Sequence, residues 1–296
     1  KNYHTKTFPH ISLDNSTYQD AKDSISFQNH KITITRANGT KMAGGQGGGK
    51  RQEVNGFSRQ SRRRCLLKLA TVDFSAYKTK FFSTFTFRNE YPETKEGLKS
   101  LLVLLLKRIE RIPFVSCIFW RVEYQKRGAP HIHLLVLIRE KLKSREVIQC
   151  GKMQKKAWGE LTASLNPMSF TRGSEIIEIR GDEKVYFYLS KYVAKVENND
   201  KNKRLGRVWG VRGEVVKQTI LDEEVPEAII NRFIELYKNS LSAKFPLDEH
   251  FEFYLCNAES VTLLIPSIHL RLIFKLIMKE KPFWQPSEKL KSLLNL

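Results

Sequence analysis

The alternation of apolar and polar positions predicts an ordered series of strands and helices in the middle of the chain. Aromatic and β-branched residues dominate 81–87, which predicts a strand, and leucines at helical spacing over 91–111 predict a helix. Two strands, at 118–125 and from 131 onward, flank a loop at 126–130. A helix over 144–165, a strand over 174–179 and a helix over 183–196 follow. This β-α-β-β-α-β-α order predicts an α+β fold, a ferredoxin-like antiparallel sheet with helices packed on one face.

The flanking segments are less regular. Residues 1–60 are polar and Gly-rich with one strand-like stretch at 31–35, so we expect a partly disordered N-terminal arm and linker. The central domain should span 61–221. Residues 222–296 form a C-terminal accessory region, mainly helical, with helices over 225–241 and 268–278 and a strand over 261–265. The glycines of 44–49 and Lys50 imitate a phosphate-binding loop, but Arg51 stands where Ser or Thr would hold magnesium, so we interpret them as linker.

The charge balance points to a polyanion as the partner. Fifty-one Lys and Arg against 31 Asp and Glu give a formal net charge of +20. An excess of this size favours nucleic acid, with a merely basic surface as the alternative. We expect Arg62, Arg63 and Arg64, which close the linker, to contact phosphates.

The composition gives no reason to expect contact with a membrane. The apolar run 101–106 is too short to span a bilayer, and residues 1–30 lack the apolar segment of a signal peptide. The four cysteines are scattered without a Cys-x-x-Cys pair, which fits a reducing compartment. We therefore expect a cytoplasmic protein, or one in the DNA-containing compartment of a host.

A candidate metal site lies on the two strands that flank residues 126–130. His131 and His133 are two apart, so in a strand both imidazoles point to one face. If Gln125 pairs with His131, then Glu123 pairs with His133, and an odd-length loop puts all four side chains on that face. Two imidazoles and a carboxylate suit a catalytic divalent cation. The alternative is a pair of hydrogen-bonded, half-buried histidines with no ligand.

A second set of candidates lies on the helix predicted over 183–196. Tyr188 and Tyr192 are four residues apart on one helix face, and Lys191 and Lys195 each follow a tyrosine by three. An amphipathic helix that packs its tyrosines against a sheet would show the same spacing. A phenol becomes a useful nucleophile only when a cation meets its developing charge, and a metal with nearby ammonium groups supplies that charge.

Together these motifs resemble the HUH endonucleases, and within them the two-tyrosine rolling-circle replication initiators of small phages and plasmids. The resemblance rests on the histidine pair and the residues that lead to it, including Arg127, on the strand at 81–87, on the doubled tyrosines and on the Gly-Arg-x-Trp-Gly stretch at 206–210. It covers residues 60–215.

The resemblance implies a site-specific nicking and joining enzyme for single-stranded DNA. His131 and His133 would bind Mg²⁺ or Mn²⁺, with Glu123 as the third ligand and Gln125 as the alternative. Tyr192 or Tyr188 would attack phosphorus and leave a 5′-phosphotyrosine, while Lys191 and Lys195 would neutralise the phosphate. The partners would be single-stranded or hairpin origin DNA, and a host or phage helicase and polymerase.

Two alternatives stay open at this point. Transposases and conjugative relaxases of the same superfamily use the same chemistry, although relaxases normally carry the tyrosine before the histidines. A protein of a different class, a non-catalytic nucleic-acid-binding module, would use a basic sheet with Phe and Tyr side chains to stack on bases.

Overall fold

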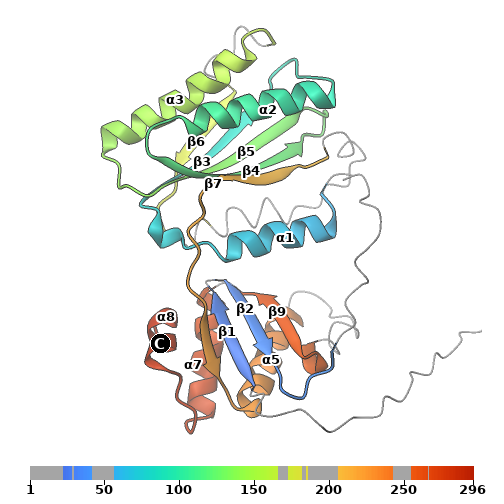
Figure 1. Ribbon diagram of the computed structural model, residues 1–296, viewed down its shortest axis with the longest axis vertical. Helices are drawn as coiled ribbons and strands as arrows, with labels where there is room; N and C mark the ends of the chain where they lie inside the picture. The colour runs from blue at the N-terminus through green and yellow to red at the C-terminus, as the bar shows by residue number, and fades with distance from the viewer. Residues whose placement is uncertain are drawn as a thin grey trace, which may run out of the picture.

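The computed structural model describes residues 23–28, 30–41, 57–165, 173–181, 185, 206–242, 255–265 and 267–296. These residues form two bodies, each built on an antiparallel sheet (Figure 1). Strands and helices alternate in the first body, and helices cover the sheet of the second. The predicted α+β class with antiparallel pairing and a helical C-terminal part is confirmed.

The first body contains the predicted ferredoxin-like series of elements. Its strands lie in the order β6-β3-β5-β4-β7, with antiparallel neighbours throughout. Four of them match predicted strands, whereas β7 lies within a stretch identified above only as a motif. Their bounds are Thr79–Thr86 for β3, Val115–Tyr124 for β4, Pro130–Ile138 for β5, Ser174–Glu178 for β6 and Trp209–Gly213 for β7.

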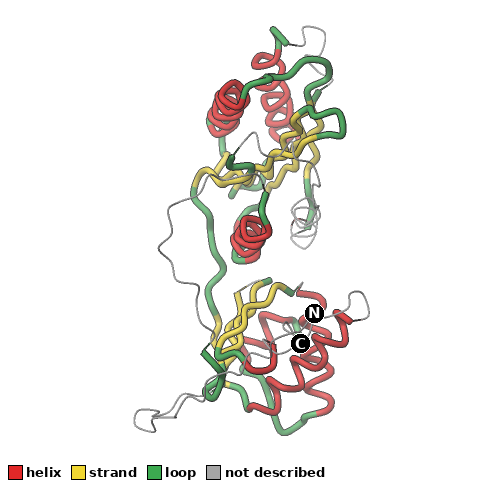
Figure 2. The backbone as a smooth tube through the Cα atoms, turned by 90° about the vertical axis from the view of Figure 1, so that its right-hand side faces the viewer, coloured by secondary structure: helices red, strands yellow, loops and turns green. Residues whose placement is uncertain are grey.

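Helices cover both faces of this sheet. Helices α2 (Lys95–Glu110) and α3 (Ser144–Thr162) pack on one face, as predicted. Helix α1 (Arg59–Ala70) lies against the other face, and Figure 2 shows the strand layer between the two sets of helices. The apolar pattern gave no sign of α1, because its first turns are almost entirely polar and basic. A short 3-10 turn, η1 (Phe74–Ala76), connects α1 to β3.

The second body combines the two ends of the described chain. Its sheet has the order β8-β1-β2-β9, so an N-terminal hairpin forms the middle of a sheet completed by later strands. The expectation of one weakly ordered arm over 1–60 is therefore wrong for residues 23–41, and the region 222–296 is not a separate unit. Its elements are β1 (Ser24–Gln28), β2 (Lys31–Thr35), β8 (Leu221–Glu224), α5 (Glu227–Ser242), β9 (Ser260–Leu264), α7 (Ser267–Glu280) and α8 (Glu288–Leu294).

Apolar residues at alternate positions of β1 and β2 hold this body together. Ile25, Phe27, Ile32 and Ile34 are fully or almost fully buried against the helices. The ring of Phe27 meets that of Phe274 on α7 edge-on, with centroids 5.6 Å apart. The polar residues between them stay half-buried on the opposite side of the sheet.

The two bodies meet at the C-terminal end of α1. The backbone N–H of His30, in the turn between β1 and β2, donates to the carbonyl of Ala70 at 3.1 Å. The next carbonyl, of Thr71, accepts from Gln218 N at 3.0 Å, and Gln28 Nε2 donates to Gln218 O at 2.9 Å. Hydrogen bonds from three segments thus converge on one junction.

Some predictions fall outside the described residues. The linker at 44–49 and the helix over 183–196 do so, with the exception of Val185. Within the parts of the chain that the structure does describe, no helix has both the length and the apolar character needed to cross a bilayer.

Candidate functional site

The hairpin of β4 and β5 carries the predicted metal ligands. Glu123 lies opposite His131, and Arg121 lies opposite His133. The predicted pairs, Gln125 with His131 and Glu123 with His133, are therefore wrong by two positions. The turn is shorter than expected because Pro130 already belongs to β5, a position that proline tolerates as the first residue of a strand.

A shift of two residues keeps every side chain on its predicted face. Because side chains alternate along a strand, Glu123 still lies on the face of His131 and His133. The two imidazole centroids are 4.5 Å apart, and Glu123 Oε2 lies 3.5 Å from His133 Nε2. The predicted grouping of these three side chains on one face is confirmed, whereas their role as metal ligands remains a prediction.

Neighbouring strands fix the orientation of His133. Its Nδ1 lies 3.3 Å from the hydroxyl of Thr84 on β3, and Phe82 on the same strand stacks on its ring at 5.6 Å. His133 is buried, while His131 at the mouth of the hairpin is half-buried. The Nε2 edge of His133 consequently faces Glu123, and His131 is the more accessible of the two imidazoles.

An arginine that the sequence analysis missed completes the group. Arg121 Nη1 forms an ion pair with Glu123 Oε1 at 2.9 Å, and both side chains are about 6% exposed. On its other side the guanidinium lies over the ring of Phe57 at 4.5 Å from the centroid. The alternation of charged residues at Arg121 and Glu123 within an apolar strand was the signal in the sequence.

The donor types in this group suit a divalent cation. Neutral imidazole and carboxylate are common ligands of such ions, and Thr84 is placed to orient one imidazole through its Nδ1. Among the described residues, however, no set of three or more His, Cys, Asp and Glu side chains already forms a metal cluster. One oxygen of Glu123 is held by Arg121 and the other lies against His133, so the carboxylate would have to turn to bind a metal.

Gln125 and Arg127 lie away from this group, in the turn. The backbone N–H of Gln125 donates to Ala129 O at 2.9 Å, which closes the hairpin. The side chain of Arg127 donates to Gln125 Oε1 at 3.0 Å, to Arg88 O at 2.6 Å and to Phe87 O. Arg127, predicted to bind DNA, therefore ties the turn to the end of β3, and Gln125 is less well placed than Glu123 as a third ligand.

The arginines at 62–64 belong to α1, which lies on the histidine face of the sheet. Arg63 and Arg64 are exposed, and Arg62 is half-buried. The helix is fixed to β7 by a hydrogen bond from Trp209 Nε1 to Ser61 Oγ at 2.8 Å. The structure thus brings the predicted phosphate-binding helix to the same side of the sheet as the imidazoles.

The four candidates of the tyrosine helix, Tyr188, Lys191, Tyr192 and Lys195, lie outside the described residues. Val185, just before them, is fully buried in the cluster that contains Phe82 and Leu135. Both of these residues point to the histidine face, because Phe82 stacks on His133 and Leu135 follows it by two. The chain therefore approaches the tyrosines on the face that carries His131 and His133.

Comparison with protein families gives one match. Residues 80–197 match a family of replication-associated proteins, the ORF2 family. The matched range includes both histidines, Glu123 and both tyrosines. No curated protein and no solved structure matches the chain significantly.

Proposed function

From the similarity of residues 80–197 to replication-associated proteins, we propose that this chain initiates DNA replication by nicking and rejoining single-stranded or hairpin origin DNA. The observation that carries the proposal is the shared face of His131, His133 and Glu123, together with the burial of Val185 on that face. The net charge of +20 supports a nucleic acid as the substrate.

Helical spacing brings the tyrosines into the argument. In the predicted helix, Tyr188 and Tyr192 follow Val185 by three and seven residues, which places all three on one stripe. Because Val185 is buried against the histidine face, a helix that continues from it would direct both phenols toward the imidazoles. Either tyrosine would then reach a phosphate held between them.

The reaction proposed is a transesterification. The phenol oxygen of Tyr192 or Tyr188 bonds to phosphorus after losing its proton, and the bond from phosphorus to the 3′ oxygen breaks. The 3′ oxygen leaves with a proton as a free hydroxyl, and the DNA is held as a 5′-phosphotyrosine. Because one phosphoester replaces another, the reverse reaction rejoins the strand without ATP. Two tyrosines allow one to hold the parental end while the other cuts the new origin.

His131 and His133 would hold Mg²⁺ or Mn²⁺, with Glu123 as the third ligand. A cation bound there would polarise the scissile phosphate and lower the cost of charge on the attacking oxygen. Lys191 and Lys195 would neutralise the phosphate, and Arg63 and Arg64 on α1 would contact the backbone of the bound strand. A helicase and a polymerase from the host or phage would extend the free 3′ end.

The test is covalent capture. The full chain is incubated with Mn²⁺ and a pool of single-stranded and hairpin oligonucleotides, and adducts that resist denaturant are isolated on a gel. We expect an adduct that chelator abolishes and that His131→Ala reduces strongly. Peptide mapping should locate the nucleotide on Tyr188 or Tyr192.

Tyrosine variants separate the roles of the two phenols. Tyr188→Phe and Tyr192→Phe should each keep some first-step cleavage, and the double variant should have none. Tyr186→Phe is the matched control, because residue 186 lies away from the stripe of Val185. Binding that is salt-sensitive but gives no adduct across the whole pool would favour a non-catalytic module instead.

A further inference from the structure

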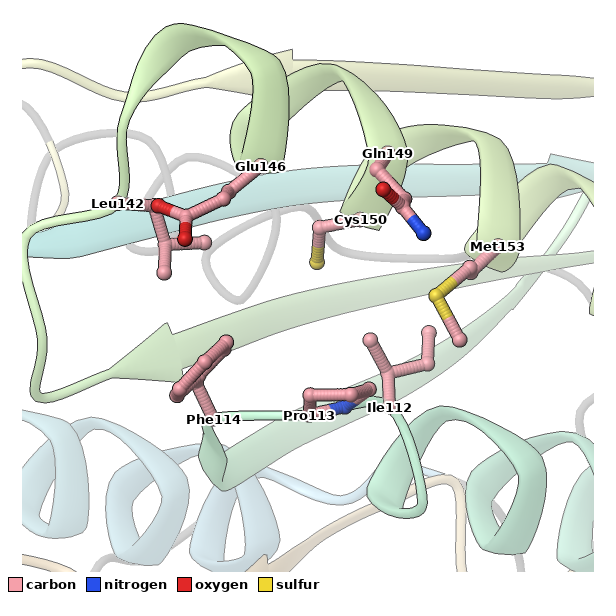
Figure 3. Close-up of a pocket in the computed structure, with 8 residues that line it drawn as sticks. All are labelled: Ile112, Pro113, Phe114, Leu142, Glu146, Gln149, Cys150 and Met153. Atoms are coloured by element: carbon pink, nitrogen blue, oxygen red, sulfur yellow. The ribbon is translucent and has the colours of Figure 1, made fainter.

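The outer side of α3 carries an apolar pocket beside a row of cations. The pocket has a volume of about 240 Å³ and lies between α3 and the turn that joins α2 to β4. Figure 3 shows Ile112, Pro113 and Phe114 on one wall, with Cys150 and Met153 of α3 facing them. This space suits one large apolar side chain, and a methionine in the wall adapts easily to different guests.

The backbone at this pocket is strained. Phe114 has φ of 70°, in the left-handed region that bulky residues rarely adopt. Its ring is nevertheless 51% exposed, so burial of the ring does not compensate for the strain. Strained residues with exposed apolar side chains are typical of binding sites, where the partner supplies the missing contacts.

Charge defines the kind of partner. Arg145, Lys152 and Lys156 line a shallow depression next to the pocket, with Ile148 among them at 59% exposure. Arg145 and Lys152 form no ion pair with any residue that the structure describes, and Lys156 has only Glu160 at 3.8 Å. An apolar slot beside unneutralised cations is complementary to an acidic segment that carries an apolar side chain.

We propose that this surface, formed by the pocket at Phe114 and the cations of α3, docks an acidic peptide segment of a partner protein through one large apolar side chain. Helix α3 covers the sheet face opposite His133, so a partner can dock while DNA occupies the histidine face. The proposal does not depend on the nicking chemistry.

The test starts from short random peptides displayed on phage and selected against the full chain. Enriched peptides should contain Asp or Glu flanking Phe, Leu or Ile. Their affinity is then measured by fluorescence polarisation. The double variant Arg145→Glu/Lys152→Glu should weaken binding about tenfold, because two attractions become repulsions. The matched control, Lys275→Glu/Lys279→Glu on α7, changes the net charge equally and should bind like the parent.

A variant at Phe114 tests the apolar slot. Asparagine tolerates the left-handed conformation, so Phe114→Asn should leave the unfolding midpoint nearly unchanged and weaken the peptide at least about fivefold. Three outcomes would overturn the proposal. One is the enrichment of peptides without acidic residues, or of none. The second is displacement of the peptide by a thymine oligonucleotide with the same sensitivity to the variants, which would make the surface a nucleic-acid site. The third is self-association that the double variant abolishes, which would make the occupant a second copy.

Discussion

The ion pair of Arg121 and Glu123 gives the sharpest prediction about the site. The two groups are 2.9 Å apart, so at an effective dielectric constant of about 20 their attraction is about 6 kcal/mol. Desolvation of both charges offsets much of this in the intact protein. Arg121→Met removes the cation but leaves the buried carboxylate, and we expect it to lower the free energy of unfolding by about 3–5 kcal/mol.

Calorimetry of the full chain in the presence of chelator measures this loss. For a body of this size it corresponds to a drop of about 6–20 °C in the midpoint of its transition. The double variant Arg121→Met/Glu123→Gln removes both charges and should lose clearly less than the single variant. Two single effects that simply add would show that the pair is not coupled, and a loss under about 1 kcal/mol for Arg121→Met would refute its buried character.

Metal provides a second measurement on the same variants. If Glu123 belongs to a cation site, Mn²⁺ should raise the midpoint of Arg121→Met more than that of the parent, because the added ion replaces the lost positive charge. Saturation at about 100 times the dissociation constant stabilises the folded state by about 2.7 kcal/mol. A variant that also lacks the carboxylate should gain less.

Three further predictions concern other parts of the chain. Burial lowers the pKa of His30 from 6.5 to about 4, so the unfolded chain takes up this proton first as the pH falls; stability should drop by about 3 kcal/mol between pH 6.5 and 4, and His30→Leu should flatten that part of a urea-denaturation profile. Ser83 Oγ donates to Gln154 Oε1 at 2.6 Å in the core, so Ser83→Ala should cost about 1–3 kcal/mol in the same assay, and Ser83→Ala/Gln154→Leu should recover part of it. Burial raises the pKa of the Cys65 and Cys117 thiols to about 12, so both should resist iodoacetamide at pH 8 until the protein unfolds, and modification of the native protein at either site, found by mass spectrometry, would contradict this.

The elements of the first body could be predicted because their signals are local. Leucines of α2 at helical spacing and the alternation of the β4–β5 hairpin follow from the geometry of each element alone. The exact partners of Glu123 and His133 depended on the turn, where Gly128 at φ of 85° allows a tighter connection than the loop length suggests.

Features that depend on distant residues were not predictable in the same way. Arg121 owes its position partly to Phe57, which comes from a segment well before β4 in the chain. Helix α1 has too few apolar residues for a periodic pattern and is held by contacts such as that of Ser61 with Trp209. The hairpin of β1 and β2 finds its neighbours only in β8 and β9, so no local pattern could place it.

The position of that hairpin also constrains the order in which the chain matures during synthesis. Strands β1 and β2 leave the ribosome early, yet the strands on both of their edges follow only after the whole first body. The first body can fold as soon as its own strands have emerged, whereas Phe27 and Ile32 must wait for α5 and α7 to cover them. A ribosome that stalls before residue 221 would therefore release a folded histidine sheet with a sticky, unpaired hairpin attached, a species prone to capture by chaperones or to aggregation.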